Sequence, residues 1–110
     1  MVWLDSRRQA RRYPIRTSLL FREQGASEWR EASTLNLSRT GVLFRAEGAI
    51  PRQGAAMDFV VTLPLNGLTP SPQARCSGRV VRVRPEEFRG GGCAVAVTID
   101  EYTLESRAAE

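Results

Sequence analysis

The chain has 110 residues, of which 42% are hydrophobic and 25% are charged, and its formal net charge is +4. This length suits one domain with one core, and the composition is typical of a globular protein rather than a disordered chain. Histidine is absent, which removes the commonest general base, and Cys76 and Cys93 alone make no zinc pattern. We therefore expect neither an enzyme nor a metal or cofactor site.

All 16 basic residues are arginine. A genome rich in arginine codons would explain this, but so would a need for planar forks of donors toward phosphate, carboxylate or guanine. Five arginines lie within residues 7–16, in the stretch RRQARRYPIR, and Pro14 disfavours a helix through its predecessor. We expect an extended, flexible tether ahead of the first strand, carrying Arg7, Arg8, Arg11 and Arg12.

Apolar residues alternate with polar ones in several short runs that turn residues separate, which predicts antiparallel strands. The proline-rich stretch PLNGLTPSPQ is expected to be a crossing loop. Six strands with polar turns favour a closed barrel, because closure removes unpaired edges. The predicted strands cover residues 15–22, 29–37, 41–46, 57–63, 74–84 and 92–100.

The alternation also predicts side-chain directions. In the second run Leu35 and Leu37 should point inward, and Thr34 and Asn36 outward. In the third run Leu43 and Arg45 should point outward. Arg79, Arg82 and Arg84 are expected to form a solvated face of the fifth run.

The last two runs should form a hairpin in which Arg84 faces Gly92. Cys76 would then lie opposite Asp100 and Cys93 opposite Val83, so that the cysteines do not meet. This fits a reduced intracellular protein, and the sequence shows neither a membrane span nor a signal peptide. We expect a cytoplasmic location.

A second polar cluster, NLSRTG at residues 36–41, lies at the end of the second run. Asn36 and Ser38 are two apart in an extended chain and project from one face. Gly41 would allow an unusual backbone angle or close approach by a ligand. Taken alone, this pattern is also that of an ordinary hairpin turn.

Together, the two clusters resemble the PilZ domain, a six-stranded barrel that binds the bacterial second messenger cyclic di-GMP. The family motif pairs Arg-x-x-x-Arg with Asp/Asn-x-Ser-x-x-Gly, and here these are residues 8–12 and 36–41. The resemblance implies Arg8, Arg12, Asn36, Ser38 and Gly41 as ligand contacts. Weaker candidates are Arg7, Arg11, Arg39 and Arg45, since Arg7 with Arg11 and Arg12 with Arg16 have the same spacing.

The resemblance implies three segments: an N-terminal tether at 1–14, a barrel at 15–100, and a tail or short helix at 101–110. The tether would close over cyclic di-GMP and change what the domain presents to a protein partner. Guanine suits arginine because its O6 and N7 atoms accept two parallel hydrogen bonds from the guanidinium. A barrel that binds a protein but no nucleotide is the main alternative, and non-specific nucleic-acid binding and catalysis rank lower.

Overall fold

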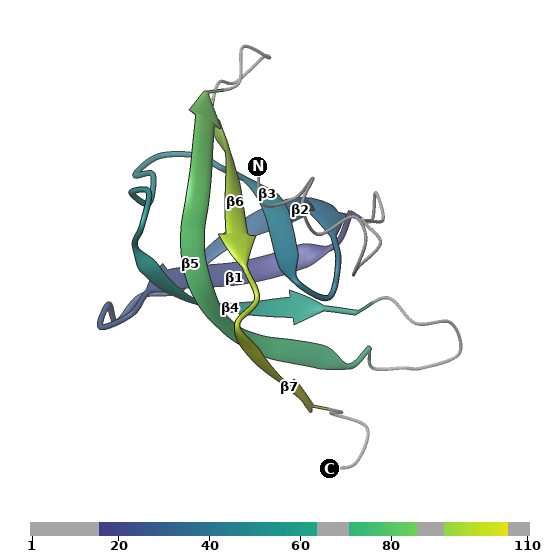
Figure 1. Cartoon of the computed structure of the whole chain (residues 1–110). Coiled ribbons are helices and arrows are strands. Elements are labelled where there is room, and N and C mark those ends of the chain that lie inside the picture. Colours follow the sequence, from purple (N-terminus) through teal and green to yellow (C-terminus); the bar gives the residue numbers. More distant parts are fainter. Residues whose placement is uncertain (1–15, 64–70, 86–91, 106–110) are drawn as a thin grey trace.

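The computed structural model describes residues 16–63, 71–85 and 92–105, which form one antiparallel sheet of seven strands and no helix (Figure 1). Each predicted run contains one strand, with bounds that differ by at most a few residues. Among the described residues, no helix is long and apolar enough to cross a membrane. The strands are β1 (Ser18–Glu23), β2 (Arg30–Leu37), β3 (Gly41–Ala46), β4 (Ala56–Thr62), β5 (Gln73–Pro85), β6 (Cys93–Thr98) and β7 (Glu101–Glu105).

Six of these strands close into a barrel. Their order is β4-β1-β2-β3-β6-β5, and a further pairing of β4 with β5 joins the two ends. All of the pairings are antiparallel. Closure leaves no unpaired edge among these six strands, which confirms the predicted six-stranded antiparallel barrel.

The seventh strand corrects the expectation for the C-terminus. Residues 101–105 form β7, which pairs with the first part of β5 from Ser77↔Glu101 to Gln73↔Glu105. The predicted tail or short helix is therefore wrong over these residues, and residues 106–110 lie outside the described part of the chain. Backbone pairing with an open edge of β5 outweighs the weak helical preference of so short a segment.

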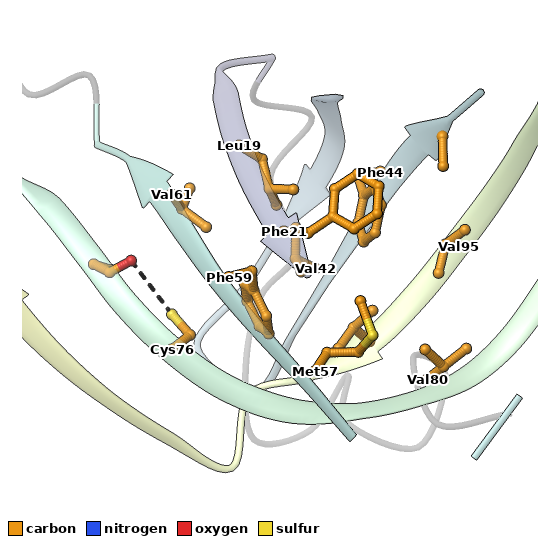
Figure 2. Close-up of a cluster of buried hydrophobic side chains, with 13 residues drawn as sticks. Leu19, Phe21, Val42, Phe44, Met57, Phe59, Val61, Cys76, Val80 and Val95 are labelled. Carbon is orange, nitrogen blue, oxygen red and sulfur yellow. Dashed lines mark hydrogen bonds between the residues drawn. The ribbon is translucent and has the colours of Figure 1, made fainter. Parts of the chain in front are cut away.

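The barrel encloses a core of aliphatic and aromatic side chains (Figure 2). Phe21 and Phe44 lie with their ring centroids 4.9 Å apart, and both are almost completely buried. Burying a side chain of this size contributes about 1.5–3 kcal/mol. The predicted inward residues Leu19, Phe21, Val42, Phe44, Ala46, Met57, Phe59 and Val61 all belong to this core.

The long strand β5 changes partners along its length (Figure 1). Its first part lies between β4 and β7, and its later part pairs with β6. At the corner, a Cβ atom on Gly78 would lie 1.7 Å from the carbonyl oxygen of Thr98, so only glycine fits. The change of partner therefore depends on a close backbone approach.

The closing hairpin has a different register from the predicted one. Cys93 lies opposite Pro85 rather than Val83, and Cys76 lies opposite Tyr102 of β7. Both cysteines are free, as expected. Burial raises the pKa of the Cys76 thiol to about 11, because desolvation disfavours the thiolate.

Candidate functional site

The β2–β3 turn is organised around the hydroxyl of Ser38. The amide N–H groups of Thr40 and Gly41 each donate to Ser38 Oγ at 3.2 Å. The amide of Ser38 donates in turn to the carbonyl of Gly41 at 3.0 Å. Ser38 is only 7% exposed. Its hydroxyl therefore shapes the turn that follows Asn36, as expected for a serine-assisted hairpin.

Gly41 lies at the start of β3, opposite Thr98 of β6. The described glycines with positive φ are Gly25, Gly48, Gly54 and Gly92, so Gly41 does not occupy the left-handed region. The suggested need for an unusual backbone angle is therefore wrong. Close approach by a ligand or a neighbouring chain remains the physical reason for a glycine at this position.

A β-bulge in β2 determines which of its side chains face outward. Thr34 pairs with Phe44 and Asn36 with Leu43, which leaves Leu35 as the extra residue. Thr34 is fully buried and its Oγ1 accepts a hydrogen bond from the amide of Thr17 at 2.9 Å. The predicted outward direction of Thr34 is wrong, because one extra residue resets the alternation. Asn36, beyond the bulge, faces outward as predicted.

The register places Asn36 in a row of side chains across the outer face of four strands. Successive pairs are Asn36↔Leu43, Leu43↔Ala96 and Ala96↔Arg82. We call this the Asn36 row. It joins the motif at the end of β2 to an arginine of β5 that lies far away in the sequence.

A second row runs beside the first. Its pairs are Ser33↔Arg45, Arg45↔Ala94 and Ala94↔Arg84, and we call it the Arg45 row. Arg45 therefore shares the outer face with Asn36, as the alternation predicts, and it is half-buried. Arg39 is exposed within the β2–β3 turn. The two rows contain three arginines and no carboxylate.

A cavity of about 810 Å³ opens on the outer face of β4, β1, β2 and β3. This volume lies within the range of about 300–1,000 Å³ that small-molecule sites occupy. Its lining includes Arg16 and Arg45, but also Glu31 and Glu47. The cavity therefore has mixed charge and meets the Arg45 row at Arg45 itself. Sequence reasoning missed the bulge residue Leu35, which also lines it.

The structure brings together one of the two predicted motifs. Asn36, Ser38 and Gly41 lie at one end of the β2–β3 hairpin, with Arg39 in the turn and Arg45 farther along β3. The other candidates lie outside the described residues, and their role stays a prediction: Arg7, Arg8, Arg11 and Arg12. No group of three or more metal-ligating side chains occurs within residues 16–63, 71–85 and 92–105.

Comparison with known proteins follows this geometry. A family model described as PilZ domain matches residues 6–109, a range that contains both motifs. The fold is similar to that of the Bacillus subtilis inhibitor of motility (MotI/DgrA), with a TM-score of 0.72 and 16% sequence identity over 86% of this chain. This chain spans only 43% of that protein. No curated protein sequence matches.

Proposed function

This chain belongs to the PilZ domain family, a family of receptor and adaptor domains for cyclic di-GMP, and on that premise we propose that it binds cyclic di-GMP on the outer face of its barrel. It would do no chemistry on the ligand. The observation that carries the proposal is that one matched range contains both Arg-x-x-x-Arg and Asn-x-Ser-x-x-Gly, and that the second motif ends in an outward Asn36 beside an arginine-bearing face.

The residues suit the two chemical parts of the ligand. Guanine presents O6 and N7 as acceptors, which a guanidinium fork from Arg8 or Arg12 meets with two hydrogen bonds. The amide of Asn36 can donate and accept, and the two phosphates attract further arginines. Ser38 keeps its predicted role as a ligand contact, although its hydroxyl also holds the turn.

Closure of residues 1–14 over the ligand would be the signalling event. Fixing each residue costs about 1–2 kcal/mol in backbone entropy, so several charge-assisted bonds must offset it. The arginines should therefore act together, and loss of either Arg8 or Arg12 should remove most of the affinity. The closed tether would present a new surface to a protein partner.

Calorimetric titration of the full chain with cyclic di-GMP tests this function. We expect binding by the wild type and at least tenfold weaker binding by Arg8→Ala, Arg12→Ala and Asn36→Ala, since tenfold corresponds to about 1.4 kcal/mol. Arg52→Ala is the control, because Arg52 is an exposed arginine of the β3–β4 connection. Its affinity should match the wild type.

The adaptor alternative predicts a different outcome. A PilZ barrel that binds only a protein would give no heat with cyclic di-GMP at tens of micromolar ligand. That result for a folded wild-type chain would contradict the proposed function. Equal weakening by Arg52→Ala and Arg8→Ala would instead indicate non-specific attraction of an anion to a basic protein.

A further inference from the structure

The outer face of β3, β6 and β5 forms a shallow groove with a floor of alanine. Ala94 and Ala96 are almost completely buried, yet neither belongs to the core cluster inside the barrel. Their neighbours across the strands are longer, with Leu43 and Arg45 on β3 and Arg82 and Arg84 on β5. The two walls stand about 9–10 Å apart, which is twice the spacing of paired strands.

The arginines on the β5 wall differ from most arginines elsewhere on the barrel. Arg22 forms an ion pair with Asp58 and Arg75 with Glu105, each at 3.4 Å. Arg79 donates to a backbone carbonyl. Within the described residues, Arg82 and Arg84 make neither a hydrogen bond nor an ion pair.

Bulges stand at both ends of the Asn36 row. The register of β2 with β3 shifts between Thr34 and Asn36, and that of β5 with β6 shifts between Val80 and Arg82. Asn36 and Arg82 therefore each follow a bulge residue directly. Bulges are frequent beside binding sites, where they redirect a side chain. The same device at the two ends of one row indicates that both side chains serve the same surface.

We propose that this groove is the second half of the ligand site and holds one guanine of cyclic di-GMP, an inference that rests on the proposed function. The flat face of the base lies on the methyl groups of Ala94 and Ala96. Its O6 and N7 edge accepts two hydrogen bonds from Arg82. The absence of carboxylates from both rows favours an anionic ligand here over the cavity, where Glu31 and Glu47 would repel phosphate.

The neighbouring features explain why one ligand would use both halves. The Asn36 row spans three strand spacings, or about 14 Å, between its end residues. A dinucleotide has two bases, and the motif turn with Asn36 engages one of them. Arg45 lies between the turn and the groove, where a phosphate that joins the two nucleosides would pass. Arg82 is thus a specificity-determining residue for guanine.

Calorimetric titration of the full chain with cyclic di-GMP tests the groove with four variants. Arg82→Ala should bind at least tenfold more weakly than the wild type. Arg82→Lys keeps the charge but loses the planar fork, so it should weaken binding to a similar extent. Ala96→Leu should block the floor. Arg75→Ala removes the same charge from the same strand outside the groove and should remain within twofold of the wild type.

The outcomes separate the groove from the proposed function. If the wild type binds and Arg82→Ala binds equally well, the groove is not part of the site and the proposed function stands. If Arg82→Lys binds like the wild type, the guanidinium does not read the base edge and the proposal fails in that respect. If the folded wild type binds no cyclic di-GMP, both proposals are wrong. A thermal melt checks that Ala96→Leu is folded, and Arg82→Ala decides alone if it is not.

Discussion

The inner and outer faces of the same strands obey different rules. On β3 and β6 the inward residues Val42, Phe44, Val95 and Val97 are completely or almost completely buried in one apolar core. The residues between them on the outer face include Leu43 and Arg45. Packing specifies the inner face, because each side chain must fill a shared volume. The outer face is free of that demand, so its arginines and small alanines reflect what the surface binds.

The largest effect should come from breaking the inner face. Phe44→Ala removes a fully buried ring that packs against Phe21, and we expect a loss of about 3–5 kcal/mol in the free energy of unfolding. Arg84→Ala, on the outer face of β5, should change stability by less than about 0.5 kcal/mol. Urea denaturation of both variants measures the contrast. Similar losses in the two would show that the outer face also carries the fold.

An intermediate effect should come from the residue that the bulge turns inward. Thr34→Val keeps the shape of the side chain but removes the acceptor of the Thr17 amide, which leaves that donor without its partner. We expect a loss of about 1–3 kcal/mol by the same denaturation measurement. Ser33→Ala, at the exposed neighbouring position, is the matched control. Wild-type stability of Thr34→Val would contradict the role of Thr34 as the polar anchor of β2.

The smallest effect concerns the one core side chain that titrates. Because burial raises the pKa of Cys76 to about 11, against an ordinary value of 9.0, the folded chain holds this proton more tightly than the unfolded chain. The resulting stability is complete below pH 9 and is lost as the pH rises toward 11. Stability measured across this range should fall less steeply for Cys76→Ala than for the wild type, whereas Cys93→Ala should keep the wild-type slope. Equal slopes in all three would contradict the burial of the thiol.

The sequence was sufficient for the strands and for the inner face, because a period of two appears within each run. It was not sufficient at Leu35 and Val81, where bulges add one residue and leave no local signal. It also missed β7, since Glu101–Glu105 becomes a strand only because β5 offers it an edge. These misses have one cause, which is that pairing between distant segments overrides local preference.

The candidate site divides in the same way. The outward directions of Asn36 and Arg45 follow from alternation, and the motif at residues 36–41 was recognisable from its spacing. The neighbourhood of Asn36 and Arg82 was not, because it requires β6 to lie between β3 and β5. Local sequence therefore predicts single residues of this face but not the surface that they form together. The contribution of Arg8 and Arg12 stays a prediction.

The central claim is that the outer face recognises guanine in a cyclic dinucleotide. Titration of the full chain with cyclic di-GMP and, in parallel, with cyclic di-AMP tests it most directly, because the two ligands share their phosphates and differ in the base. Adenine carries an amino donor in place of O6, so each arginine fork would meet a donor and lose about 1–3 kcal/mol. We expect cyclic di-GMP to bind at least tenfold more tightly. Equal affinity for the two ligands, or no binding of cyclic di-GMP, would contradict the claim.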